Sequence, residues 1–116
     1  MSRASRFAAT VAMILVAGGP AALAAGGGAA GEAFMQAETR MSEAMRKPMV
    51  GDADQDFATM MRAHHQGAID MARVELQYGT DPELRRMAQG IIDAQTKEIE
   101  SIDRWLKEKP IEGGTR

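Results

Sequence analysis

Hydrophobic residues recur every three or four positions from about residue 32 to residue 109, without the alternation of apolar and polar residues that marks a strand. This spacing gathers apolar side chains on one side of a helix. We therefore predict an all-α chain with helices over 32–47, 52–78 and 80–109. The predicted stripes are Phe34, Ala37, Met41 and Met45, then Phe57, Met60, His64, Ala68, Met71, Val74 and Tyr78, then Leu84, Met87, Ala88, Ile91, Ile92, Ile99, Ile102, Trp105 and Leu106.

The segment around residue 50 holds the boundary between the first two helices. Pro48 ends the first, because the residue before a proline is pushed out of the helical region. Asp52, with Gln55 three residues later, fits an acidic variant of the capping box at the start of the second. The aspartates here also look like the start of a calcium loop, but such a loop needs glycine and glutamate where this chain has Phe57 and Ala63. Helix capping is therefore our interpretation of these aspartates.

A short turn separates the second and third helices. Gly79 is a typical residue after the end of a helix. The third helix begins either with Thr80 and Glu83 as a capping box, or with Asp81 as the cap and Pro82 in the first helical position. Either start leaves room only for a tight connection, so we predict that these two helices form a long antiparallel hairpin within a three-helix unit.

The N-terminus has the pattern of a secretory signal peptide. Arg3 and Arg6 form a short basic region, an apolar run follows, and Ala22-Leu23-Ala24 offers a cleavage site. An uncleaved anchor is the alternative, although Gly18-Gly19-Pro20 interrupts a spanning helix. We predict Sec-type export to the periplasm or the medium, with no stable membrane anchor after cleavage. The predicted parts are a signal peptide at 1–24, a flexible leader at 25–31, a helical domain at 32–109 and a frayed tail at 110–116.

Charge and length narrow the class of protein. Cleavage after residue 24 leaves 92 of the 116 residues, with twelve basic and sixteen acidic side chains and a net charge of −4. Such a chain forms one domain at most, and it lacks the basic face that nucleic-acid binding requires. The chain has no cysteine, so disulfides cannot stabilise it and helix packing, metal or association must do so.

The two histidines of the chain stand side by side in the second helix, among several methionines. Imidazole nitrogen and thioether sulfur are the ligands that soft ions such as copper prefer, and thioethers need no deprotonation. We predict a copper site that favours Cu(I), with Cu(II) and Ag(I) as alternatives. Core packing is the competing explanation of the methionines. The candidate ligands are His64, His65, Met61, Met60, Met41 and Met45.

Two polar residues of the third helix are expected to face the histidines. If the hairpin turns at Gly79, His64 lies about 21 Å from the turn, level with residues 95 and 96. Gln95 and Glu98 interrupt the apolar stripe at this height. A carboxylate or amide on the second imidazole nitrogen commonly supports a histidine ligand, so we predict both residues behind the metal ligands. A polar core in which Glu98 bonds a histidine without metal is the alternative.

The same argument applies across the Pro48 turn. It sets Met41 level with Met60 and Met61 at ~1.5 Å of rise per helical residue. We therefore expect Met41 to join a site with Met61 and His65.

Several runs of this sequence together resemble the family called domain of unknown function 305, over about residues 34–106. The resemblance implies a bacterial exported, ferritin-like helical domain in one or two copies, and some relatives are periplasmic copper-binding or copper-resistance proteins. It implies ligand roles for His64, His65, Met61, Met41 and Met45. Ser42 and Ile102 depart from the pattern, where relatives often have histidine and methionine. The runs are Asp54, His64-His65-Gln66-Gly67-Ala68-Ile69-Asp70-Met71-Ala72, Asp81-Pro82-Glu83-Leu84, Ile91-Ile92, Gln95, Glu98-Ile99 and Trp105-Leu106.

The expected function is copper binding for tolerance or trafficking. Enzymatic activity is not expected, because neither histidine has a glutamate three residues earlier, as a di-iron site requires, and no zinc-protease motif is present. One alternative is a helical interaction module whose polar core contains His64, His65, Gln95 and Glu98. A divergent ferritin-like enzyme is another.

The breadth of the apolar surface predicts association. The second and third helices carry apolar residues over wide arcs that a short first helix cannot cover. We therefore predict a homodimer in which two hairpins pair into a four-helix core.

Overall fold

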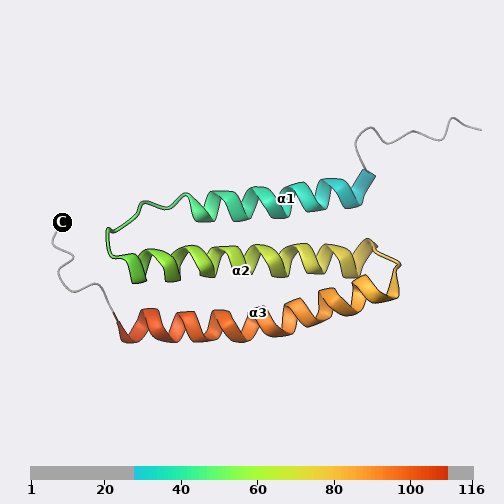
Figure 1. Cartoon of the computed structure of the whole chain (residues 1–116). Helices are drawn as coiled ribbons and strands as arrows, with labels where there is room; N and C mark the ends of the chain where they lie inside the picture. Colours follow the sequence, from blue (N-terminus) through green and yellow to red (C-terminus); the bar gives the residue numbers. More distant parts are fainter. Residues whose placement is uncertain (1–27, 110–116) are drawn as a thin grey trace, which may run out of the picture.

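The computed structural model describes residues 28–109, which form three helices. They are α1 (Gly28–Met45), α2 (Ala53–Tyr78) and α3 (Pro82–Glu108) (Figure 1). The all-α prediction is confirmed over this range, and so is the three-helix unit with its long antiparallel hairpin. A ferritin-like core takes four helices, so that part of the fold stays a prediction.

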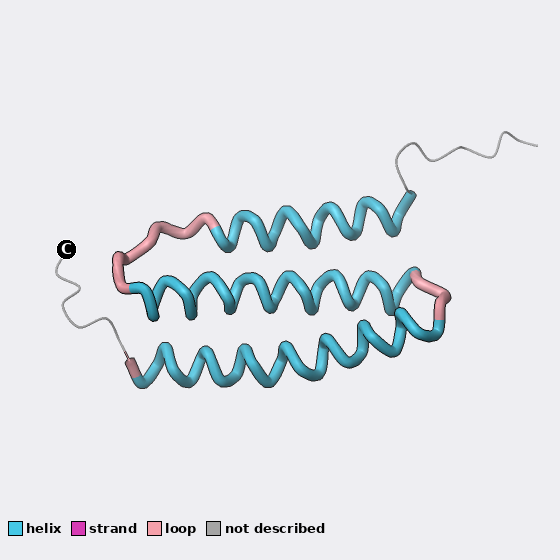
Figure 2. Tube along the Cα trace, viewed as in Figure 1, coloured by secondary structure: helices cyan, strands magenta, loops and turns pink. Residues whose placement is uncertain are grey.

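The three helices lie side by side in sequence order, with α2 in the middle (Figure 1). The two loops lie at opposite ends, so each helix runs antiparallel to the next (Figure 2). Helix α2 contacts both neighbours, whereas within residues 28–109 no Cα atom of α1 comes within 8 Å of α3. The arrangement is therefore an open layer of helices.

Aspartate side chains begin α2 and α3. The Asp52 carboxylate accepts a hydrogen bond from the backbone N–H of Gln55 at 2.8 Å. The Asp81 carboxylate accepts from Glu83 and Leu84 at 3.0 and 2.9 Å. Asp81, followed by Pro82 in the first turn, is thus the cap of α3, which decides between the two predicted starts.

Arg85 fastens the hairpin turn. Its Nη1 donates to the carbonyl oxygens of Leu76 at 2.7 Å and Gly79 at 2.9 Å. These carbonyls belong to the end of α2, where helix geometry leaves them without an intrahelical partner. A charged side chain from the first turn of α3 therefore fixes the angle at which the hairpin closes.

The first helix is longer at its start than predicted. It begins at Gly28, so residues 28–31 of the predicted leader are helical. Two alanines in this stretch favour helix, and extending an existing helix costs less than starting one. The predicted signal peptide at 1–24 and tail at 110–116 lie outside the described residues. Among the described helices, none is sufficiently apolar over a sufficient length to cross a bilayer.

Small residues dominate the contacts between helices. Five of the seven buried residues other than glycine are Ala37, Ala58, Ala72, Ala88 and Val74, and Ile69, at 3% exposure, is the largest buried aliphatic side chain. Of the stripe predicted for the second helix, only Val74 is buried. The prediction assumed one neighbour, but α2 has two. Small side chains meet both neighbours, and the larger apolar residues lie to one side of these contacts.

Candidate functional site

His65 lies in the contact between α2 and α3 and is 7% exposed. Its Nε2 is hydrogen-bonded to the carboxylate of Glu98, which lies at the height that the hairpin register predicts. A carboxylate can only accept, so Nε2 carries the proton of this bond. His65 Nδ1 is buried without a hydrogen-bond partner, as is Oε1 of Gln95. The predicted polar core thus forms around one of the two histidines.

His64 is exposed on a different side of α2. Consecutive helical residues point about 100° apart, and the two ring centroids are 6.2 Å apart with planes at 64°. His65 faces α3, while His64 faces solvent. The structure therefore does not direct the two imidazoles into one site.

Three methionines line one hollow where the α1–α2 loop meets α2. Met45 ends α1, Met49 lies in the loop, and Met60 is in the second turn of α2. The hollow has a volume of about 270 Å³, and Pro48 and Asp56 also line it. Met45 and Met60 were candidate ligands, and the structure brings them together. The position of Met49 depends on the path of the loop, which helical spacing does not give.

Asp56 shapes the loop that carries Met49. Its carboxylate accepts hydrogen bonds from the backbone N–H groups of Val50 at 2.8 Å and Gly51 at 3.0 Å. Gly51 has φ of +90°, in the left-handed region that favours glycine. These contacts explain the acidic run by loop and helix capping, and they fix one wall of the methionine hollow.

Met41 lies on the opposite side of α2 from His65. Its side chain packs against Gly67, at the contact between α1 and α2. Gly67 and His65 are two positions apart, so they point about 200° apart around the helix. The expectation that Met41 joins Met61 and His65 was wrong. Met61 remains one turn before His65 and is half-buried.

The loop explains the misplaced Met41. A tight turn at Pro48 would set Met41 beside Met60 and Met61. Residues 48–50 are instead irregular, and extended backbone advances about 3.3 Å per residue against about 1.5 Å in a helix. The loop therefore shifts α1 along α2, so that Met41 meets Gly67.

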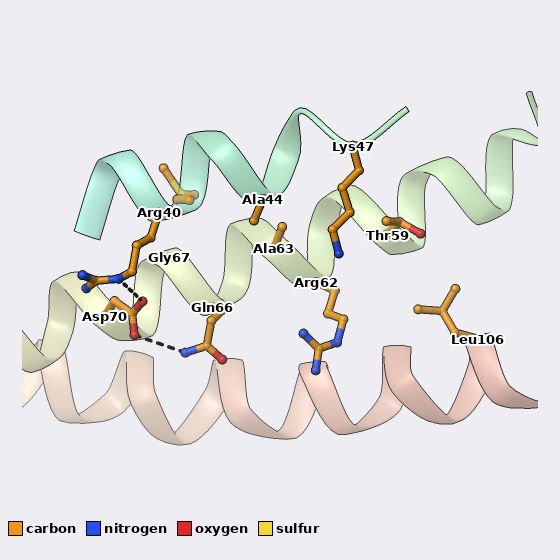
Figure 3. A pocket seen from close by; sticks show the side chains of 11 residues that line it. Arg40, Ala44, Lys47, Thr59, Arg62, Ala63, Gln66, Gly67, Asp70 and Leu106 are labelled. Carbon is orange, nitrogen blue, oxygen red and sulfur yellow. Dashed lines mark hydrogen bonds and ion pairs between the residues drawn. The ribbon is translucent and has the colours of Figure 1, made fainter. Parts of the chain in front are cut away.

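A polar groove, which the search for metal ligands missed, crosses one face of the layer (Figure 3). It has a volume of about 480 Å³, and its lining includes Arg40, Lys47, Arg62, Gln66 and Asp70. Gln66 donates to the Asp70 carboxylate at 3.2 Å, and Arg40 lies 3.7 Å from it. The spacing of Arg62, Gln66 and Asp70 at four residues was the available signal.

Arg62 joins α2 to α3 beside this groove. Its Nε lies 2.5 Å from one oxygen of Asp103, and its Nη2 lies 3.1 Å from the other. The hydrogen bond to Asp103 raises the pKa of Arg62 above its ordinary value, and the charge of Asp103 adds to this. Burial of the guanidinium acts in the opposite direction. Both side chains are nearly half exposed, so we expect the pair to position the helices more than to stabilise them.

Carboxylates and imidazoles do not form a metal cage in the described part of the chain. Within residues 28–109, no group of three or more His, Asp or Glu side chains is arranged to hold a metal ion. The candidate donors therefore fall into two separate places. One is the hollow of Met45, Met49 and Met60, and the other is His65 with Met61 one turn before it.

Comparison with known proteins concerns the whole of this helical unit. No curated protein matches the chain. A family model described as "Domain of unknown function (DUF305)" matches residues 17–106, which include all three helices except the last two residues of α3. The chain therefore belongs to the family of this domain of unknown function.

Proposed function

We propose that this chain is an exported, non-enzymatic protein that binds copper, Cu(I) in preference, for copper tolerance or trafficking. The observation that carries the proposal is the hollow lined by Met45, Met49 and Met60. Thioether sulfur is a soft, neutral donor that suits Cu(I). Three such donors from α1, the loop and α2 can meet an ion without losing a proton.

The surroundings of the hollow suit a site that exchanges its ion. Met49 is more than half exposed, whereas Met45 and Met60 are half-buried. Two donors thus belong to the packed helices and one to the loop. An ion bound here stays within reach of a delivery partner, as tolerance and trafficking both require. Copper would supply no catalytic step in this role, and the protein would only hold it and pass it on.

Replacing Met45, Met49 and Met60 together by leucine should weaken Cu(I) binding at least about 100-fold, which corresponds to about 2.8 kcal/mol. Leucine keeps the volume and apolar character of methionine while removing the sulfur. The measurement is a competition titration against a Cu(I) chelator under anaerobic, reducing conditions. Ag(I) and Cu(II), titrated in parallel, test the preference among the three ions.

The matched control replaces Met35, Met71 and Met87 by leucine. These methionines lie outside the hollow, so the control should bind Cu(I) as the parent does. Unchanged affinity in the Met45, Met49 and Met60 variant would refute the hollow. Equal losses in both triple variants would show that methionine content, and not this site, determines affinity.

A second candidate function is a metal-free interaction module with a polar core. The hydrogen bond of buried His65 to Glu98 favours it, because that bond joins α2 to α3 without any ion. The unpartnered Nδ1 of His65 favours the other interpretation, since a histidine ligand commonly has a carboxylate on its second nitrogen. Copper affinity in a Glu98 variant separates the two roles.

Glu98→Ala should lower the free energy of unfolding by about 1 kcal/mol, because it removes the partner of a buried imidazole. The exposure of Glu98 keeps this cost small. Copper affinity should stay unchanged if the methionine hollow holds the ion. Urea denaturation and the same competition titration measure the two quantities, with exposed Glu100→Ala as the control. A drop in copper affinity without a loss of stability would instead place the ion at His65.

A further inference from the structure

One side of α2 faces neither neighbouring helix. His65 and Ile69 are buried toward α3, while Gly67 and Asp70 meet α1. A third stripe lies between these contacts at spacings of three, four and seven residues, which place its members on one side of the helix. The stripe comprises Phe57, His64, Ala68, Met71, Glu75 and Tyr78.

The stripe is apolar and largely uncovered. Phe57 is 66% exposed and Tyr78 is 39% exposed. The same surface continues on α3, where Met87 is 56% exposed and Trp105 joins Phe57 in lining a groove of about 400 Å³. We call this surface of α2 and α3 the apolar face. Large exposed apolar patches of this kind mark interaction sites.

The opposite side of the layer has a different character. It carries the polar groove with Arg40, Lys47, Arg62 and Asp70 (Figure 3). Arg62 and Asp103 form an ion pair there. The layer thus has one charged side suited to water and one apolar side that the described chain leaves open. An amphipathic layer reaches a stable fold by burying its apolar side against another layer.

We propose that a second copy of this chain covers the apolar face, hairpin against hairpin, in a two-fold symmetric dimer. A 26-residue helix is about 39 Å long, and packed helices lie about 9 Å apart, so α2 and α3 offer about 700 Å². Stable interfaces bury about 800 Å² per partner, so the face has the required size. The pairing gives a four-helix core with one α1 on each outer edge.

The stripe itself selects the register of the two copies. A two-fold axis requires that residue i meets residue j and that j meets i. With the axis near Ala68, antiparallel α2 helices set Phe57 opposite Tyr78 of the partner subunit and His64 opposite Met71 of the partner subunit. The small side chain at the axis allows close approach, and the aromatic residues close both ends. The interface is then complementary to itself over the whole stripe.

The absence of cysteine makes the register directly testable, because a single introduced thiol is the only one in the chain. In metal-free exported protein, Ala68→Cys should be joined to its mate in most chains by a short bis-maleimide. Gln66→Cys, on the polar side of the same helix turn, should stay largely unlinked. The unmodified protein should show a mass of two chains in light scattering at micromolar concentration.

A charge in the face should separate the copies. Phe57→Glu should raise the dimer dissociation constant at least about 100-fold while the far-ultraviolet circular dichroism stays helical. Gln77→Glu adds the same charge on the polar side and should leave the dimer intact. A mass of one chain for the parent protein overturns the proposal, as does equal linking at positions 66 and 68. A single-chain mass for Ala68→Cys, with its thiol shielded from maleimide, would show that the chain's own N-terminal segment covers the face. The experiment contains no copper, so its outcome is independent of the proposed metal site.

Discussion

Ile69→Ala is expected to reduce the free energy of unfolding by about 3 kcal/mol, within the 2–5 kcal/mol typical of such truncations. Ile69 is the largest buried aliphatic residue in the described helices, and its neighbours in the core are mostly alanines. Alanine side chains cannot move to fill the lost volume, so the cavity persists. A small single core supplies only about 3–5 kcal/mol, so this one change removes most of the stability.

Urea denaturation followed by circular dichroism, at fixed protein concentration, measures this effect. Val50→Ala is the control, because Val50 is 54% exposed and interacts with Asp56 through its backbone N–H, which the substitution keeps. We expect the control to change stability by less than about 0.5 kcal/mol. Equal costs for the two substitutions would mean that the contact between α2 and α3 is not the main core of the protein.

Two glycine-to-alanine substitutions are expected to have opposite effects on stability. A Cβ atom at Gly67 would lie 2.5 Å from Cγ and 2.7 Å from Cβ of Met41, closer than side chains pack. Because Cβ of Met41 is fixed to the α1 backbone, the two helices must separate. Overpacking costs about 1–3 kcal/mol, which outweighs the gain of about 1 kcal/mol from replacing a helical glycine.

Gly90→Ala is the matched control. Gly90 is also inside a helix, and an added Cβ there meets nothing within 4 Å. It should stabilise the protein by up to about 1 kcal/mol through helix propensity alone. Thermal or urea unfolding of both variants measures the difference in sign. Adding Met41→Ala to Gly67→Ala should recover part of the loss, and a stabilising Gly67→Ala would contradict the close contact of α1 with α2.

The sequence was most informative where geometry is local. The ends of α2 and the start of α3 follow from Asp52, Gly79 and Asp81, whose capping roles depend on residues next to them. The level of Glu98 with His65 follows as well, because a tight turn leaves only the rise per residue to count. These features need no knowledge of the rest of the fold.

Other features depend on long-range geometry that the spacing of residues does not contain. Met41 was misplaced because its position depends on the path of an irregular loop. The stripe from Phe57 to Tyr78 was predicted as the packed side of α2, yet a middle helix buries two narrower seams of small residues. The grouping of Met49 with Met45 and Met60 depends on the loop conformation that Asp56 and Gly51 fix.

The layered order of the helices also has consequences for how the protein assembles and opens. Each helix contacts only its neighbour in the chain, so the contact order is low and folding needs no long loop closure. The hairpin of α2 and α3 forms one cooperative unit, and α1 can detach from it without breaking any contact to α3. The methionine hollow lies across this joint, because Met45 belongs to α1 and Met60 to α2. A ligand held by both therefore latches α1 onto the hairpin, and local unfolding of α1 becomes a route for its release.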